Sequence, residues 1–129
     1  MPLLRHQRQR FPTGCGPACI AMIARTTQLQ ACKVIFGETR RRSYFTDWAD
    51  VKRALKLLRV QTGPRAYKVT DWDSIQSLSL VGCSRLADGT WHLVVCSPKE
   101  RLIYDPWRPR PVPLARMRRK PFSYLSVRP

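Results

Sequence analysis

The sequence predicts a single α+β domain in which a central N-terminal helix packs on a small antiparallel sheet. An apolar run that opens with Cys-Gly-Pro predicts a buried helix near the N-terminus. Later in the chain, short runs rich in β-branched residues predict consecutive strands. The chain has 129 residues, 43% of them hydrophobic, which is enough to bury one core of this kind.

The first helix is expected within the compact run from Cys15 to Thr26. Pro17 suits the first helical position, where a missing N–H has no cost, and Gly16 is expected to cap the helix. Apolar residues lie around most of its circumference: Ala18, Cys19, Ile20, Met22 and Ile23. Such a helix belongs at the centre of a domain.

A second, amphipathic helix is predicted with Thr46 as its cap and Gly63-Pro64 as its end. Its acidic residues precede its basic residues, an order that complements the helix dipole. Apolar residues recur at helical spacing at Trp48, Val51, Leu55 and Leu58. A short strand is predicted at Tyr67 to Thr70, followed by a brief helix through about Leu78.

The strands are expected to form a meander from LSLVGCSRL, TWHLVVC and RLIYD. Ala87-Asp88-Gly89 and the stretch Ser97 to Glu100 separate them. Beyond Pro106 many prolines exclude long regular elements, apart from one terminal strand at Phe122 to Val127. We therefore expect one domain spanning 1–129, with a basic, Pro/Arg-rich C-terminal segment at about 108–129.

The charge is strongly basic, with 24 Lys and Arg against 8 Asp and Glu and a formal net charge of +16. This predicts attraction to nucleic acid or another polyanion, with a strong dependence on salt. A solvated basic tail is the alternative interpretation. No run reaches the ~20 apolar residues that span a bilayer, and the N-terminus lacks the apolar core of a signal peptide. We expect a cytoplasmic protein, or one that is delivered by another system or packaged in a particle.

Five cysteines without a CxxC pair argue against a disulfide framework and against a zinc ribbon, and favour a reducing compartment. Cys15 stands at a helix start, where unpaired N–H groups and the helix dipole favour a thiolate, and its glycine neighbours leave the sulfur accessible. Cys19, Cys83 and Cys96 are expected to be small core residues. Cys15 is therefore the candidate nucleophile.

A candidate base and its orienting acid follow from the last hairpin. If the turn at Ser97 to Glu100 closes an even loop, His92 faces Asp105 and Leu93 faces Tyr104. Opposed side chains lie about 4.5–5.5 Å apart at Cβ, so the carboxylate can bind one imidazole nitrogen and aim the other at a nucleophile. A structural buried pair, or a register slip of one residue that separates the two, remains the alternative.

Thiolate attack on a carbonyl also needs an oxyanion donor. Gln7 and Gln9 are available, and spacing alone does not choose between them.

The segment QRQRFPTGCGPACIAMIA resembles the opening of C39-type (bacteriocin-processing-like) and related papain-like cysteine peptidases. Their pattern is a Gln six residues before Cys-Gly-x-Ala-x-x-x-Met, and here Gln9 stands six residues before Cys15. TWHLVVCSPKERLIYDP resembles the family's second block, in which a His opens an apolar strand and an Asp-Pro follows the hairpin. The resemblance implies a papain-like fold, with Gln9 as oxyanion donor, Cys15 as nucleophile, His92 as general base and acid, and Asp105 as its orienter. The basic stretch after Asp105 is not part of the family's pattern.

The expected function is thus a cysteine hydrolase, a peptidase acting on a peptide or protein substrate without metal or cofactor. Trp91 and Trp107 flank His92 and Asp105 and are expected to line the substrate site. The alternative is a nucleic-acid-directed protein on the same scaffold, such as a toxin-like nuclease or a phage or mobile-element protein. Basic residues near aromatic ones would serve it: Arg40, Arg41, Arg42, Arg118, Arg119 and Lys120. A third interpretation is a structural part of an assembly that has kept the triad.

Overall fold

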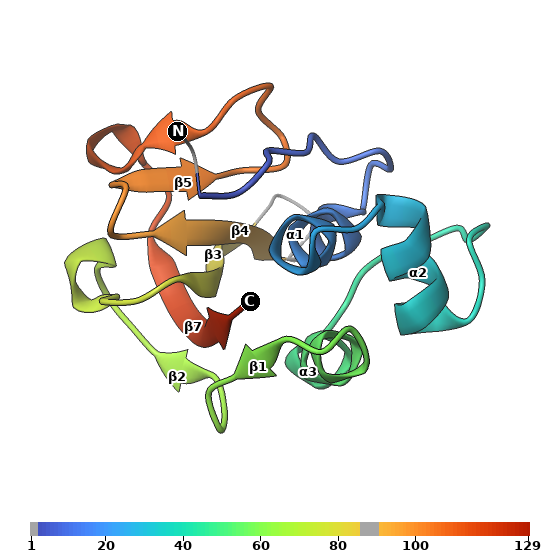
Figure 1. Cartoon of the computed structure of the whole chain (residues 1–129). Helices are drawn as coiled ribbons and strands as arrows, with labels where there is room; N and C mark the ends of the chain where they lie inside the picture. Colours follow the sequence, from blue (N-terminus) through green and yellow to red (C-terminus); the bar gives the residue numbers. More distant parts are fainter. Residues whose placement is uncertain (1–2, 86–90) are drawn as a thin grey trace.

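The computed structural model describes residues 3–85 and 91–129, and in that part of the chain helices cover one face of an antiparallel sheet (Figure 1). The α+β class is therefore confirmed. The predicted turn at Ala87-Asp88-Gly89 lies outside the described residues. The helices are α1 (Cys15–Ala24), α2 (Gln28–Phe36) and α3 (Trp48–Leu57), with 3₁₀ turns η1 (Trp72–Ser74) and η2 (Leu114–Arg116). The strands are β1 (Gln61–Thr62), β2 (Tyr67–Lys68), β3 (Ser79–Arg85), β4 (Trp91–Ser97), β5 (Leu102–Tyr104), β6 (Val112–Pro113) and β7 (Pro121–Arg128).

Helix α1 begins two residues earlier than the position of Pro17 suggests. Gly14, not Gly16, is its N-cap, so Cys15 is the first helical residue. Pro17 is still compatible with the first turn, because none of the first N–H groups of a helix has an intrahelical partner. The predicted cap was wrong, and the correction places Cys15 inside the helix end rather than before it.

Helix α2 was not predicted, and α3 has a different cap from the expected one. Thr27 accepts a hydrogen bond from the Gln30 N–H at the start of α2, and Gly37 ends that helix with a φ of 77°. At the start of α3 a capping box forms between Asp47 and Asp50, so Thr46 lies one residue too early to be the cap. The helix ends well before Gly63-Pro64, and only a single 3₁₀ turn follows Asp71 in place of the brief helix.

The sheet order is β1-β7-β3-β4-β5-β6, with β2 pairing with β7 as well. The β3-β4-β5 meander is confirmed. The terminal strand β7 is longer than expected and returns to lie beside β3, so β3 and β4 become central strands. Central strands are covered on both faces, which agrees with the unbroken apolar runs in their sequences.

The register of the β4-β5 hairpin differs from the prediction by two residues. Tyr104 pairs with Val95 rather than with Leu93, and Ser97 pairs with Leu102 across a four-residue loop. Because side chains alternate with a period of two, a shift of two residues keeps every side chain on its predicted face. His92 and Asp105 therefore remain on one face, as diagonal neighbours instead of directly opposed ones.

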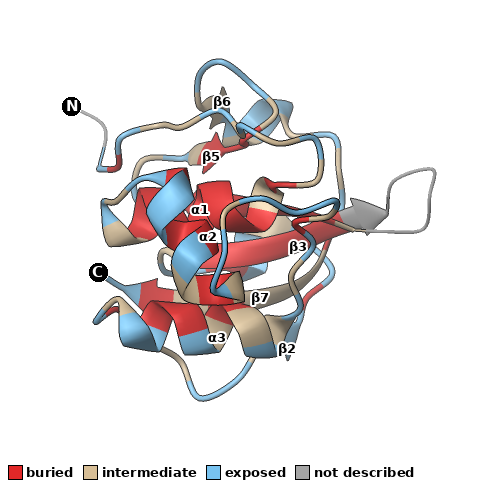
Figure 2. Cartoon of the chain, turned by 90° about the vertical axis from the view of Figure 1, so that its right-hand side faces the viewer, coloured by how far each residue is buried: buried red, intermediate tan, exposed pale blue. Residues whose placement is uncertain are grey.

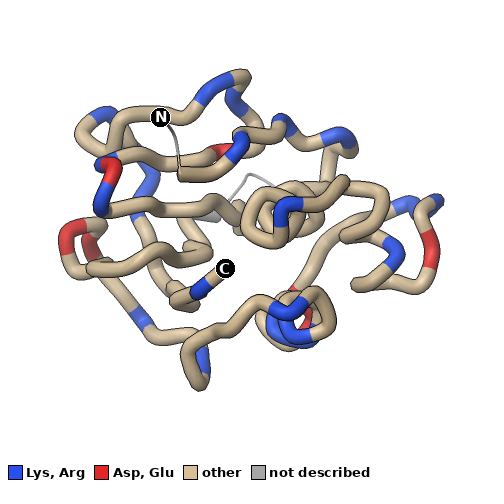
Figure 3. Tube along the Cα trace, viewed as in Figure 1, with Lys and Arg blue, Asp and Glu red and all other residues tan. Residues whose placement is uncertain are grey.

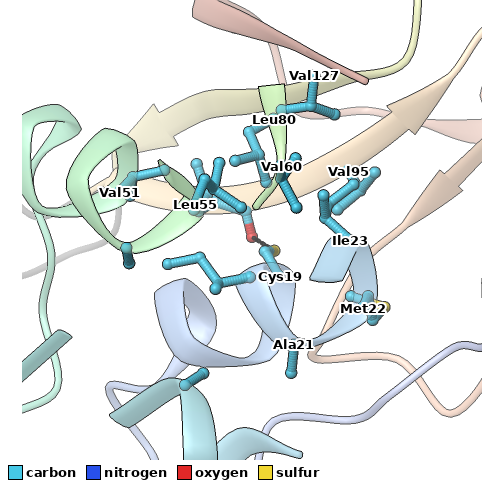
Figure 4. Close-up of a cluster of buried hydrophobic side chains, with 14 of the residues drawn as sticks. Cys19, Ala21, Met22, Ile23, Val51, Leu55, Val60, Leu80, Val95 and Val127 are labelled. Carbon is cyan, nitrogen blue, oxygen red and sulfur yellow. Dashed lines mark hydrogen bonds between the residues drawn. The ribbon is translucent and has the colours of Figure 1, made fainter. Parts of the chain in front are cut away.

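The main core lies between the helices and the sheet (Figure 2). Cys19 of α1 is fully buried there, and its thiol donates a hydrogen bond to the Leu93 carbonyl 3.3 Å away (Figure 4). A smaller core covers the other face of the sheet beneath η1 and η2, and it includes Cys83 and Cys96. Both are fully buried, so the prediction that they are small core residues is confirmed, and burial raises the pKa of both thiols to about 12.

The N-terminal arm, residues 3–10, runs beside the hairpin and the loop after it (Figure 1). Glu100 accepts hydrogen bonds from the Leu3 N–H and the Tyr104 hydroxyl, both at 2.8 Å. Further along, the Gln9 N–H donates to the Pro106 carbonyl at 2.7 Å. These bonds hold the segment before α1 against the segment after β5.

Lys and Arg are spread over the whole trace (Figure 3). None of the helices within residues 3–85 and 91–129 has the length and apolar character needed to cross a bilayer.

Candidate active site

Cys15 is a half-buried thiol at the first position of α1, whereas the other four cysteines are buried. The first N–H groups of a helix have no intrahelical partner. Pro17 has no N–H group, so the N–H groups of Cys15 and Gly16 are the ones that remain to bind a ligand. A Cβ on Gly16 would lie 2.3 Å from the Thr46 hydroxyl oxygen. Glycine at this position therefore lets the segment before α3 approach the end of α1 closely.

His92 and Asp105 form the hydrogen bond that the sequence predicted. Nε2 of His92 lies 2.7 Å from Oδ1 of Asp105, and both side chains are buried. The same oxygen accepts the Trp107 N–H at 2.9 Å. Burial alone would raise the pKa of Asp105, but the hydrogen bond and charge of His92, with smaller contributions from the Trp107 N–H and Arg119, lower it.

The other imidazole nitrogen is the one that remains for Cys15. Nδ1 of His92 is buried without a hydrogen-bond partner among the described residues. Burial lowers the pKa of His92, yet the hydrogen bond to Asp105 and the nearby Cys15 thiol outweigh it, and the pKa is raised. Because Asp105 occupies Nε2, we assign the interaction with Cys15 to Nδ1. The structure thus brings the predicted nucleophile, base and orienter close together.

An aromatic and a cationic group cover this pair. The Trp107 indole stacks on the His92 ring with centroids 4.1 Å apart and an angle of 22° between the planes. The Arg119 guanidinium lies over the Trp107 indole at 4.9 Å. Trp107 therefore packs directly on the imidazole that binds Asp105.

Trp91 and Cys15 both line a small hollow of about 20 Å³, roughly the space of one water molecule. The hollow is lined by Cys15, Phe45, Thr46, Val51, Trp91 and Leu93. Trp91 is wedged between the rings of Trp48 and Phe122, each 5.3 Å away. A Cβ on Gly82 would lie 2.3 Å from the Trp91 ring, so glycine in β3 makes room for this indole.

Gln9 is close to the site along the chain, but its side chain has other partners. Its amide nitrogen donates to the carbonyls of Phe11 and Pro12, both at 2.9 Å, and these bonds use both amide protons. Its Oε1 atom is buried without a partner among the described residues. Gln7 donates to the Thr26 carbonyl instead, beyond the far end of α1. The oxyanion role of Gln9 stays a prediction, and it requires these amide bonds to be released.

The six basic residues of the alternative do not form one patch. Arg40 to Arg42 follow α2 on the helical face of the sheet, and Arg41 pairs with Glu38 at 2.9 Å. Arg118 to Lys120 follow Met117, which packs in the smaller core on the opposite face. Tyr44, the aromatic residue that follows Arg40 to Arg42, is buried against Phe11 with ring centroids 4.0 Å apart.

Three neighbours of the site were missed by sequence reasoning. Phe45 and Thr46 line the hollow beside the thiol, although Thr46 was interpreted only as a helix cap. Arg119 was assigned to nucleic acid but covers Trp107. No local pattern in the sequence indicates these contacts, because they join segments that are far apart in the sequence. Within the described part of the chain, no group of three or more His, Cys, Asp or Glu side chains could hold a metal ion.

No protein-family model matches the sequence, and no curated protein matches it either.

Proposed function

We propose that the chain is a cysteine hydrolase with a papain-like arrangement, and that it cleaves a peptide or amide bond. One observation carries the proposal: a half-buried thiol at a helix start lies near a buried imidazole that is bound through Nε2 to a carboxylate at 2.7 Å and has no hydrogen-bond partner at Nδ1. A structural pair would not need a thiol near the remaining nitrogen. This is the nucleophile, base and orienter logic of covalent acyl transfer.

The mechanism begins with transfer of the Cys15 thiol proton to Nδ1 of His92, which forms a thiolate and an imidazolium. The sulfur attacks the carbonyl carbon, and the new oxyanion accepts hydrogen bonds from the unpaired N–H groups at the start of α1, with Gln9 as an additional donor if its side chain turns. Collapse of the intermediate breaks the carbon–nitrogen bond, and His92 gives its proton to the leaving amine. Water then attacks the thioester with His92 as base, which releases the acid and restores the thiol.

Asp105 acts through His92. Its carboxylate fixes the ring so that Nδ1 is free for Cys15, and its negative charge stabilises the imidazolium that each half-reaction forms. The Trp107 stack keeps the ring plane in place.

Peptide cleavage tests the proposal directly. Wild-type protein is incubated with a mixture of unstructured peptides, and new termini are identified by mass spectrometry. We expect cleavage by the wild type and none by Cys15→Ser, while Cys32→Ala, a change at a buried cysteine in α2, serves as the matched control and remains active. Equal cleavage by Cys15→Ser and the wild type would contradict the proposal.

The nucleic-acid-directed function is the second candidate, favoured by the net charge of +16. It predicts that Arg40→Gln/Arg41→Gln/Arg42→Gln removes activity on RNA or DNA and that Cys15→Ser does not. The hydrolase proposal predicts the reverse for peptides, so the two variants separate the candidates.

A further inference from the structure

A cavity lies away from Cys15, between the N-terminal arm and the far end of α1. It has a volume of about 890 Å³. Such volumes are typical of sites that hold a ligand of drug size or a few peptide residues. Cys15 and Arg25 stand at opposite ends of α1, so this groove is about 15 Å from the thiol along the helix axis.

Three arginines give the groove its charge. Arg5 and Arg10 come from the arm, and Arg25 is the C-cap of α1; all three are exposed. No acidic side chain is among the described residues that line it. Arg41 and Arg53, by contrast, pair with the carboxylates of Glu38 and Asp50. The groove is therefore a place where several guanidinium groups surround a cavity without neighbouring carboxylates.

The groove is built on a fixed frame of hydrogen bonds. Gln28, which is buried, accepts the Arg10 N–H at 2.8 Å and donates to the Arg8 carbonyl at 2.8 Å. Gln7 donates to the Thr26 carbonyl at 2.9 Å and accepts from Gln28 at 3.3 Å. These bonds join the arm to the turn between α1 and α2, so the two segments that line the groove are fixed relative to each other before a ligand binds. A preformed site loses less entropy on binding.

We infer that this groove binds an acidic peptide segment. Arginine forks bind carboxylates in a bidentate manner, and three of them face one cavity. The lining also offers the apolar side chain of Leu29, which is 37% exposed, to an apolar residue of the peptide. No Phe, Tyr or Trp is among the described lining residues, so the groove lacks the stacking surfaces on which single-stranded nucleic acid depends. The inference does not depend on the chemistry of Cys15.

Fluorescence anisotropy with a labelled peptide, Glu-Glu-Leu-Glu-Glu-Leu, tests the inference. We expect Arg5→Gln/Arg10→Gln/Arg25→Gln to weaken binding by about tenfold or more at low salt, since it removes the charges that face the ligand. The matched control removes the same charge from exposed positions on α3, η2 and β7, as Lys56→Gln/Arg116→Gln/Arg128→Gln. It is expected to weaken binding by less than about threefold, through the general field alone.

Further measurements keep the inference open to refutation if the triple variant folds poorly. The single change Arg25→Gln, at an exposed position, is expected to weaken binding by about threefold, which corresponds to one exposed ion pair. Leu29→Ser should weaken binding of this peptide but not of hexaglutamate. The same affinity in a Cys15→Ser chain would show that binding is separate from the thiol. Equal loss in both triple variants, or tighter groove-dependent binding of labelled hexathymidylate than of the peptide, would overturn the inference.

Discussion

The buried pair of His92 and Asp105 makes a prediction for Asp105→Asn that depends on pH. Asparagine has nearly the same size, and its oxygen can still accept from Nε2 of His92 and from the Trp107 N–H. The change therefore removes the charge and leaves the geometry. Hydrogen bonds to charged groups stabilise by about 1.5–3 kcal/mol against about 1 kcal/mol for neutral ones, so we expect a loss of about 0.5–2 kcal/mol where both groups are ionised.

The sign of the pH dependence follows from the two shifts. The pKa of His92 is raised, so its stabilisation is fully present below its ordinary value of 6.5 and is lost as the pH rises through the folded value. The pKa of Asp105 is lowered, so its stabilisation is present above its ordinary value of 3.8 and is lost as the pH falls through the folded value. The two ranges overlap between 3.8 and 6.5.

Urea unfolding followed by tryptophan fluorescence measures the difference in the free energy of unfolding between wild type and Asp105→Asn. We expect a loss of up to about 2 kcal/mol near pH 5.5 and a smaller loss near pH 9. All other titrating groups are shared, so the difference isolates this pair. A difference that is constant with pH, or larger near pH 9, would refute the reasoning.

Three further changes test the surroundings of the site. Gly82→Ala places a methyl group 2.3 Å from the Trp91 ring, and urea unfolding should show a loss of about 1–3 kcal/mol; an unchanged midpoint contradicts this. Leu55→Ala, at a fully buried position, should cost about 2–5 kcal/mol without slowing alkylation of the candidate nucleophile in the folded protein. Glu100→Gln should lower the thermal midpoint near pH 7 but not near pH 3. Burial would raise the pKa of Glu100, but the hydrogen bonds from the Leu3 N–H and other donors lower it. The stabilisation by Glu100 is therefore lost as the pH falls. Equal losses at both pH values would contradict that explanation.

Local patterns in the sequence were sufficient for the elements that carry the site. The apolar run after Cys15 predicts a buried helix, and α1 is buried from Gly16 to Ile23. The apolar strands and their turns predict the meander. The predicted proximity of His92 and Asp105 is confirmed despite the error of two residues in register, because such a shift preserves the face of the sheet.

The parts that could not be predicted depend on tertiary contacts or on weak local signals. Helix α2 has only three buried apolar residues at helical spacing, Ala31, Cys32 and Ile35, between its cap at Thr27 and its end at Gly37. The place of β7 beside β3 depends on pairing between segments distant in sequence. The side-chain partners of Gln9 are two carbonyls in the following turn, which no spacing rule indicates.

The central claim is that His92 activates the thiol of Cys15, and alkylation tests it most directly. Iodoacetamide is added at about pH 6, where an ordinary cysteine, with a pKa near 8.5, reacts slowly, and the labelled residues are identified by mass spectrometry. The account predicts rapid labelling confined to Cys15 in the wild type, and labelling at least about tenfold slower in His92→Ala. Slow, unselective labelling in the wild type, or equally rapid labelling of Cys15 in His92→Ala, would contradict it.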